Sequence, residues 1–336
     1  MKIKQLFIQL TLGMLLLLSA CQNEVIPEQT GDKVALSFNL YRGELTKAAN
    51  ATTLLPDGSK IRAYAYTKGA VTTGSPVSYG DYVVDASGKA TALKENEVDK
   101  GLTLYRGNYD IYLVSYNDKN YVPETANDNL LHVSNGNDFM YSTLKGITVQ
   151  PTSGGKNMMS VDLPEPFTRL CSNIILKVKA SSNQPVTVER LWVNSVKINK
   201  LSGDLPYQLG MTEWKVNEAL EYTGSDTFET FTNNSKDIEV SPTISRVSDP
   251  VVVLPLKGIA PLEFDLDLDI RFLKTGTGSV TKSFHYYPSV YKSFLPGMTY
   301  EFEFTLTFFG DLEPTDLSLA ILEYTTVKFS TDNVGK

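Results

Sequence analysis

The chain has few of the residues that build catalytic and metal sites. Its 336 residues include 2 histidines and 2 cysteines. His132 and His285 lie far apart in the sequence and have no cysteine neighbour, so they lack the spacing of a transition-metal site. The glycine-rich stretch 275–279 lacks the helix and the lysine of a phosphate-binding loop and is typical of a hairpin tip. There is also no Gly-x-Ser-x-Gly elbow. We therefore expect no catalytic residue, metal or cofactor, although two carboxylates that meet only in the folded chain leave a hydrolase open.

The chain is also short of positive charge. It contains 31 lysines and arginines against 38 aspartates and glutamates, a net charge of −7. Its densest basic cluster is 197–200, which is too sparse for the basic patch that neutralises phosphates. We therefore do not expect a nucleic-acid partner.

Only one long apolar stretch occurs, and it lies at the N-terminus. Two lysines precede the stretch 6–18, and Leu18-Ser19-Ala20-Cys21 ends it. This order predicts a lipoprotein signal peptide over residues 1–20, cleaved before Cys21, whose sulfur then carries diacylglycerol. Multiple acyl chains such as palmitate would give a stable membrane anchor. The alternative is a transmembrane helix, but the stretch is shorter than the roughly 20 apolar residues that spanning needs.

Cysteine is scarce enough to restrict the redox chemistry of the chain. With Cys21 lipidated, Cys171 is the one thiol that remains. An intramolecular disulfide is then excluded, even in a compartment that permits one. The apolar neighbours of Cys171 predict a small buried core residue.

Alternation of apolar and polar residues is the dominant pattern. In the stretch 263–272 every even residue is apolar and every odd residue is charged, which predicts a strand with one solvated face. Its Asp265, Asp267 and Asp269 would lie about 7 Å apart along that face, too far apart to form a metal or acid/base site. The stretches 300–308 and 33–40 repeat the pattern, and further strands are predicted at 61–66, 109–116, 160–163, 174–179, 186–198 and 251–256. Many short strands separated by turn residues predict an all-β protein of antiparallel β-sandwiches.

Proline and glycine mark the expected domain organisation. Residues 21–32 are polar and contain Pro27 and Gly31, which predicts a tether between the lipid and the first strand. Pro164 and Pro166 lack backbone donors and favour extended chain, which indicates a domain boundary. We therefore expect an N-terminal β-sandwich domain at 33–165 and a C-terminal one at 166–336.

Several motifs follow the lipobox in a distinctive order. They are the strand 34–40, the tripeptide Thr46-Lys47-Ala48, the loop 55–60, the strand 61–66 and the segments 104–112, 167–174 and 295–302. In this order they resemble the fimbrillin superfamily of Bacteroidales, the subunits of FimA-type and Mfa-type fimbriae. The resemblance covers most of the chain after the signal peptide. It implies two transthyretin-like antiparallel β-sandwich domains in a structural subunit of a cell-surface fimbrium, which assembles by donor-strand exchange and contributes to adhesion.

The resemblance also implies the location and the partners of the protein. Cys21 would hold it in the lipid of the outer membrane, exposed on the cell surface. Other fimbrial subunits would bind it by strand exchange, and a host or bacterial surface receptor would be its adhesive target.

Proteolytic processing is a further implication of the resemblance. In the family a trypsin-like protease cuts after a basic residue in a segment such as Thr-Arg-Ala. The matching position here is Lys47, with Ala48 as the new N-terminus, although lysine stands where arginine is common. Because anchor subunits stay lipidated and uncut, an uncut anchor and an ordinary loop at 46–48 remain alternatives.

The first strand and the C-terminus are the expected partners in assembly. A cut after Lys47 would release the strand 33–40, in which Val34, Leu36, Phe38 and Leu40 can line one face. The C-terminal stretch 317–330 is the candidate donor for the vacated site. Its apolar residues occur in both parities, Ile321, Val327 and Phe329 in one and Leu322 and Tyr324 in the other, so the inserted face stays open. The alternative is that 317–336 is a terminal strand of the second domain.

A glycan-binding surface lipoprotein is the main competing function. The chain has 18 tyrosines, 15 phenylalanines and 2 tryptophans, and exposed rings stack on sugars. Most of these residues occupy alternate strand positions, where core packing is the commoner cause. A lipid-anchored hydrolase is the third candidate.

Overall fold

The computed structural model describes residues 31–41, 52–151, 157–182, 187–203, 205–211, 224–228, 237–239, 241–256, 261–274, 278–309, 318–321 and 327–330. Every helix or strand assigned among them is a β-strand, which confirms the all-β prediction. No helix in this part of the chain is long and apolar enough to cross a membrane.

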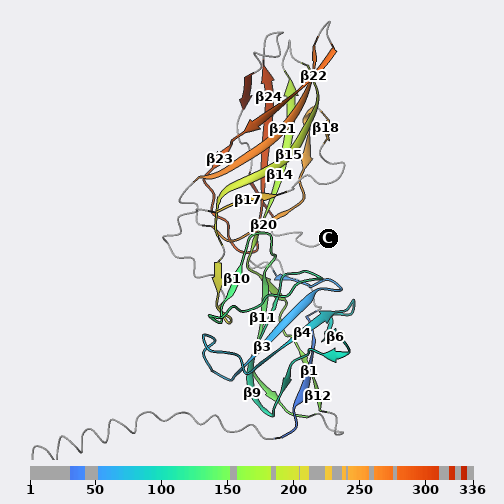
Figure 1. Ribbon diagram of the computed structural model, residues 1–336, viewed down its shortest axis with the longest axis vertical. Helices are drawn as coiled ribbons and strands as arrows, with labels where there is room; N and C mark the ends of the chain where they lie inside the picture. The colour runs from blue at the N-terminus through green and yellow to red at the C-terminus, as the bar shows by residue number, and fades with distance from the viewer. Residues whose placement is uncertain are drawn as a thin grey trace, which may run out of the picture.

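The strands fall into two successive groups. The first group is β1 (Val34–Asn39), β2 (Thr52–Thr53), β3 (Lys60–Thr67), β4 (Ser78–Val84), β5 (Lys89–Ala92), β6 (Lys94–Glu95), β7 (Val98–Asp99), β8 (Thr103–Leu104), β9 (Gly107–Ser115), β10 (Leu131–Val133), β11 (Met140–Val149), β12 (Met158–Asp162) and β13 (Phe167–Arg169). The second group is β14 (Ser172–Ser182), β15 (Thr187–Leu201), β16 (Leu205–Tyr207), β17 (Gly224–Phe228), β18 (Asp237–Glu239), β19 (Ser241–Val247), β20 (Val251–Val253), β21 (Leu262–Lys274), β22 (Gly278–Tyr286), β23 (Ser289–Val290), β24 (Thr299–Phe309), β25 (Ser318–Ile321) and β26 (Val327–Ser330). Figure 1 shows an elongated molecule with β1 and β12 near one end and β22 and β24 near the other.

A ten-stranded sheet forms the first half. Its order is β12-β1-β5-β4-β3-β9-β11-β13-β2, with β8 also paired to β1. Val161 on the first strand of this order and Phe167 near the other end belong to one buried cluster together with Ile61, Leu113 and Phe38. The sheet therefore curls so that its two ends close over a common core.

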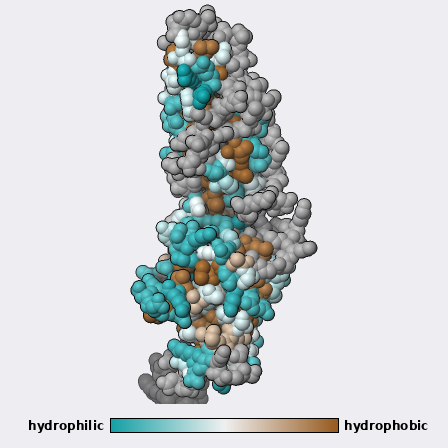
Figure 2. Space-filling model, turned by 90° about the vertical axis from the view of Figure 1, so that its right-hand side faces the viewer, coloured by the Kyte–Doolittle hydropathy of each residue, from teal (hydrophilic) through white to brown (hydrophobic). Residues whose placement is uncertain are grey.

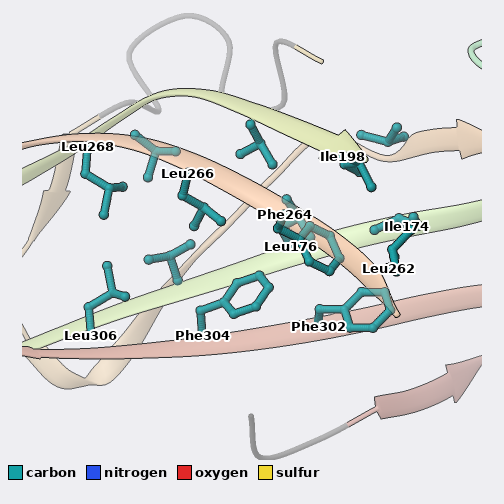
Figure 3. Close-up of a cluster of buried hydrophobic side chains, with 14 of the residues drawn as sticks. Ile174, Leu176, Ile198, Leu262, Phe264, Leu266, Leu268, Phe302, Phe304 and Leu306 are labelled. Carbon is teal, nitrogen blue, oxygen red and sulfur yellow. The ribbon is translucent and has the colours of Figure 1, made fainter. Parts of the chain in front are cut away.

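A sandwich of two six-stranded sheets forms the second half. One sheet has the order β19-β14-β24-β25, with β20 also paired to β14 and β26 to β24. The other has the order β17-β15-β21-β22, with β18 also paired to β15 and β23 to β21. Their inner faces meet in a cluster in which Phe264 of β21 lies between Phe302 and Phe304 of β24, with ring centroids 5.4 Å apart in both pairs. Figure 3 shows these side chains pointing toward one another from the facing sheets. The even-numbered apolar residues of 263–272 are buried here, as their alternation predicts.

Two strand pairs depart from the antiparallel arrangement. β1 runs parallel to β12, and β14 runs parallel to β24. In each half, the first long strand lies beside a strand from the end of that half. Such parallel neighbours need a long crossover connection, and the intervening strands of each half supply it.

A third cluster joins the two halves. β10 from the first half pairs antiparallel with β16 from the second, over Leu131–Val133 and Leu205–Tyr207. Phe139 and Tyr207 pack edge to face beside this ribbon with centroids 5.0 Å apart. The Thr72 hydroxyl donates a hydrogen bond to the Leu209 carbonyl at 2.6 Å. The chain itself passes from the first sheet to the second between Arg169 and Ser172.

Candidate functional site

The first strand fills a slot in the N-terminal sheet. Val34 and Phe38 are fully buried, and Leu36 and Leu40 are 4% and 8% exposed. The residues between them are half-buried or exposed. This confirms the expectation that these four side chains line one face, and it makes β1 part of the core of the first half.

β1 lies between neighbours on both sides. On one side Ala35–Asn39 pairs in parallel register with Met158–Asp162 of β12. On the other side Phe38 and Asn39 pair with β5, and Val34 and Ala35 pair with β8. Within the described part of the chain, β12 ends the sheet and has β1 as its one strand partner. Removal of β1 would therefore leave unpaired backbone groups on both sides of the slot.

A tyrosine hydroxyl is inserted into the ladder on the β8 side. The Leu36 amide donates to the Leu102 carbonyl at 2.9 Å, as in an ordinary antiparallel pair. The second bond of such a pair, from the Leu102 amide to the Leu36 carbonyl, is replaced by a relay through Tyr82. The Leu102 amide donates to the Tyr82 hydroxyl at 2.7 Å. That hydroxyl in turn donates to the Leu36 carbonyl at 3.1 Å. Tyr82 is fully buried, and desolvation raises its pKa, so the hydroxyl stays protonated and able to donate.

Two glycines allow this relay to form. A Cβ on Gly80 would lie 2.1 Å from the Leu102 nitrogen, and a Cβ on Gly101 would lie 2.7 Å from the Ala92 Cβ. Only glycine therefore lets the backbone around Leu102 lie directly over β4. The sequence did not reveal Tyr82, Gly80 or Gly101 as functional candidates, because their roles arise from contacts between distant segments.

The slot recognises an extended backbone and an apolar row. Its contacts with β1 are strand pairing, buried apolar side chains, the Tyr82 relay and a 2.6 Å hydrogen bond from the side-chain Nδ2 of Asn39 to the Asp162 carboxylate. Such an arrangement binds a strand by main-chain pairing and by pockets for alternate side chains.

The residues expected to carry anchoring and processing lie outside the described residues. Cys21 precedes Gly31, the first described residue, and Lys47 and Ala48 fall between Tyr41 and Thr52. Their roles therefore stay predictions. The structure places the end of β1, at Asn39, eight residues before Lys47.

The C-terminal stretch pairs within its own half in this structure. β25 and β26 both pair antiparallel with β24. In the β26 ladder, Val327 lies opposite Phe302 and Phe329 lies opposite Tyr300. A donor strand from this stretch would have to leave β24 before it could join another subunit.

Solved structures of bacterial adhesion and fimbrial proteins are similar to this chain. A candidate cell adhesion protein from Bacteroides fragilis matches 90% of this chain and 100% of its own, with a TM-score of 0.52 and 13% sequence identity. A fimbrial protein from Bacteroides vulgatus matches 88% of this chain and 100% of its own, with a TM-score of 0.48 and 12% identity. A fimbrial anchor protein from Porphyromonas gingivalis matches 89% and 98%, with a TM-score of 0.39 and 10% identity. No protein-family model matches the chain, and no curated protein matches it in sequence.

The likeness to the Bacteroides fragilis protein confirms the fold inferred from the order of the motifs. The match covers 90% of this chain and therefore extends over both halves. At 13% identity the likeness concerns architecture alone.

The two histidines lie on the surface beside carboxylates, and Cys171 lies in the core. His132 contacts Asp128 at 2.8 Å, and His285 contacts Asp265 at 2.9 Å. No group of three or more His, Cys, Asp or Glu side chains among the described residues could hold a metal ion. Cys171 is fully buried, as predicted, and burial raises the pKa of its thiol to about 12.

Proposed function

We propose that the protein is a structural subunit of a cell-surface fimbrium, exported as a lipoprotein through Cys21 and joined to its neighbours by strand exchange at the β1 slot. The fold shared with the Bacteroides fragilis cell adhesion protein supports a role at the surface. The order of the motifs supports the fimbrial assignment. Its partners are other fimbrial subunits, outer-membrane lipid and a surface receptor, and its role is structural and adhesive without catalysis.

The observation that carries this proposal is the position of β1. A strand at the beginning of the chain is paired on both sides and inserts a fully buried phenylalanine into the core. Release of such a strand would leave an apolar groove flanked by unpaired backbone groups. An open sheet edge of this kind favours the addition of another strand. Figure 2 shows hydrophobic patches separated by hydrophilic residues on the face that it draws. Because side chains that line the slot, such as Tyr82 and Val161, are buried while β1 is in place, its removal would expose new apolar surface.

The energetics favour a refilled slot. The four large apolar side chains of β1 contribute roughly 6–12 kcal/mol at about 1.5–3 kcal/mol each, and a replacement strand with fewer such side chains recovers less. Main-chain pairing with both neighbours adds to this gain, so an empty slot would favour a strand with the alternation of β1.

Proteolytic processing would convert a subunit whose slot is filled by its own β1 into one whose slot can accept a strand from a neighbouring subunit. A cut after Lys47 would separate β1 and the lipid from the chain that begins at Ala48. The C-terminal stretch 317–330 of another subunit would supply the replacement strand. The uncut form, with β1 retained and Cys21 lipidated, would serve as an anchor at the membrane.

The N-terminus of the protein on cells tests this proposal. Sequencing of the subunit in sheared surface polymers should give Ala48, and the membrane-bound form should begin at lipidated Cys21. Replacement of the thiol in Cys21→Ala should abolish incorporation of a labelled fatty acid, with Ser19→Ala as the matched control. Surface polymers whose subunits all retain Cys21 and β1 would contradict processing, and a Cys21→Ala protein that still incorporates label would contradict the lipobox.

Glycan binding is a second candidate with its own observation. Tyr121, Tyr287 and Tyr291 are between 66% and 70% exposed. The largest fully buried side chains, however, are all tyrosine or phenylalanine, so a large part of the aromatic content of the described residues serves the core. Retention of the protein on polysaccharide affinity gels, lost in Tyr287→Ala and Tyr291→Ala, would favour this function over a purely structural one.

A further inference from the structure

We propose that the protein carries mechanical tension along its chain, and that two parallel strand pairs, β1–β12 and β14–β24, are the clamps that resist this tension. The inference rests on the proposed function, because a lipid-anchored surface subunit is pulled between its membrane end and its outer end. It adds a load-bearing role that follows from the direction in which the paired strands run.

The strand order places the beginning and the end of each half side by side. In the first half, β1 is the first strand and pairs in parallel with β12, near the end of that half. In the second half, β14 is the first strand and pairs in parallel with β24, the last strand before the C-terminal stretch. Tension that enters at the start of the first strand and leaves at the end of its neighbour pulls the two strands in opposite directions along their length.

Parallel neighbours loaded in this way are sheared and do not unzip. In an antiparallel hairpin that is pulled from its open end, the ladder bonds break one after another, and each carries the load alone. The evenly spaced bonds of a parallel pair share the load and have to break together. Because forced unfolding is governed by the unfolding rate, we expect this rate to rise less steeply with force in the shear geometry.

The β14–β24 clamp has the longer ladder. It joins Asn173–Ser182 to Thr299–Phe308 in one parallel register of ten residue pairs. Apolar side chains of both strands, such as Leu176 and Phe302, are fully buried against the facing sheet. Figure 1 shows β24 running along the long axis of the molecule. Tension between the two ends of the molecule therefore acts along this ladder.

Two ion pairs cross the same ladder. Lys177 Nζ lies 3.0 Å from the Glu301 carboxylate, and Lys179 contacts Glu303. In the register Lys177 stands opposite Glu303, so its side chain leans toward the start of β24, and Lys179 leans in the same direction. Tension would move β14 in this direction relative to β24. The first sliding of the strands therefore brings each lysine toward its partner, and the ion pairs stay formed.

The β1–β12 clamp is shorter but is held on both sides of β1. Its parallel register joins Ala35–Asn39 to Met158–Asp162. The Leu163 amide extends the ladder by a 2.8 Å hydrogen bond to the Asn39 carbonyl. β5 and β8 pair with the opposite edge of β1. Tension on the start of β1 therefore loads the ladders on both of its edges in shear.

The C-terminal strands can leave without opening the second clamp. β25 and β26 pair antiparallel with the other edge of β24. β26 runs back along β24, so that Ser330 lies opposite Thr299 at the start of that strand. Tension applied beyond Ser330 would peel these strands from β24 bond by bond. It would then reach β24 at Phe309, where β14 and β24 are sheared.

Force spectroscopy on the full chain tests the clamps with two attachment geometries. One chain begins at Cys21 and carries Lys336→Cys, so that handles on these two thiols pull it end to end. Cys171 is fully buried and takes no handle. The other chain carries Cys21→Ser with Glu263→Cys and Ser289→Cys, at two positions that face each other at the open end of the β21–β22 hairpin. Its handles unzip that hairpin.

We expect the hairpin to open at least tenfold faster than either half of the end-to-end chain unfolds at the same force, with each rate taken relative to that of the same chain without load. The end-to-end chain should lengthen first as β25 and β26 peel away and then in two abrupt steps, one for each half. The step of the second half should be roughly 45 nm, at about 3.5 Å per residue over 172–309. Equal relative rates, or lengthening in many small steps, would overturn the clamps.

Two ion-pair variants locate the load on β14–β24. Lys177→Met removes the pair with Glu301 across the clamp, and Lys200→Met removes a pair with Glu263 that joins β15 to β21 outside it. Under tension Lys177→Met should make one of the two steps about threefold faster, since partly exposed ion pairs contribute modestly. Lys200→Met should leave both steps unchanged. Equal effects of the two variants would overturn the placement of the load.

These measurements separate the clamps from the function on which they rest. The response to force is measured on the isolated chain and depends neither on lipidation nor on assembly. Weak resistance in the end-to-end geometry would overturn the clamps and leave the fimbrial role standing. Strong resistance in a protein that proves absent from surface polymers would contradict the proposed function alone.

Discussion

At the scale of single residues, Phe38 contributes to the stability of the uncut chain, which still contains β1. Replacement of this fully buried side chain in Phe38→Ala should lower the free energy of unfolding of the uncut chain by about 3–5 kcal/mol. Ser37→Ala, on the opposite face of β1, is the matched control and should have a much smaller effect. Denaturant titration measures both. Equal losses in the two variants would contradict the placement of Phe38 in the core.

Asp110 holds an irregular point in the neighbouring sheet. Its carboxylate accepts hydrogen bonds from the Gly146 amide at 2.8 Å and the Gly69 amide at 3.2 Å, and Lys145 lies 3.4 Å away. The register of β11 shifts between Leu144 and Ile147, so these bonds hold a β-bulge. Burial alone would raise the pKa of Asp110, but the backbone donors and Lys145 outweigh it, and the pKa is lowered.

The lowered pKa of Asp110 predicts how stability depends on pH. Its contribution is present above the unfolded-state pKa of about 3.9 and is lost as the pH falls through the lower folded-state value. Asp110→Asn should cost about 1–3 kcal/mol at neutral pH, and its difference from the parent should shrink in acid. Denaturation curves between about pH 2 and pH 6 measure this difference. A difference that stays constant over this range would show that the carboxylate charge does not stabilise the bulge.

At the scale of elements, β12 depends on β1. The Ala35 amide donates to the Asn157 carbonyl, and the Leu163 amide donates to the Asn39 carbonyl, both at 2.8 Å. When β1 is removed, the amides of β12 should exchange with solvent at least tenfold faster, while those of β3 and β9 keep their protection. Hydrogen exchange with mass spectrometry on cut and uncut chains measures this. Protection of β12 that is unchanged after removal of β1 would mean that another segment has taken its place.

The strands most plainly marked in the sequence are those with an unbroken alternation. β1, β21 and β24 lie where the apolar rows of 33–40, 263–272 and 300–308 predict them. β11 escaped prediction because its bulge at Lys145 and Gly146 interrupts the alternation. β4 escaped because Gly80 stands where an apolar side chain would mark the row.

The candidate site was only half visible in the sequence. The apolar row of β1 could be read directly, because alternation is a local property. Its parallel pairing with β12 and the Tyr82 relay join segments that are far apart in the chain, and no spacing rule connects them. The C-terminal strands pair with β24, as the alternative of a terminal strand in the second half predicts.

At the scale of the whole molecule, the two halves should unfold together. The β10–β16 ribbon and the cluster around Tyr207 span them. Leu205→Ala, on the buried face of β16, should cost about 2–5 kcal/mol and resolve a single calorimetric transition into two. Pro206→Ala, on the exposed face of the same strand, should leave one transition. Two well-separated transitions in the parent would contradict coupling through the ribbon.

The domain boundary predicted from the sequence lies close to the point where the chain passes from the first half to the second. The boundary near Pro164 and Pro166 lies between β12 and β13, and β13 still pairs with β11 of the first sheet. We expect limited proteolysis to cut between residues 150 and 180 and to leave two folded halves, which the β10–β16 ribbon holds together until they are denatured. The absence of any cut in this range would contradict a division into two domains.

Assembly of the processed chain is the decisive test of strand exchange at the β1 slot. Protein that begins at Ala48 is prepared in two forms, one with residues 317–336 and one without them, and each is incubated and examined for SDS-resistant ladders and filaments. We expect the form with its C-terminal segment to build ladders, the shortened form to build none, and excess peptide 33–41 to stop the growth of the ladders. Equal assembly by both chains would contradict donation by the C-terminal strand, and no assembly by either would contradict strand exchange at the β1 slot.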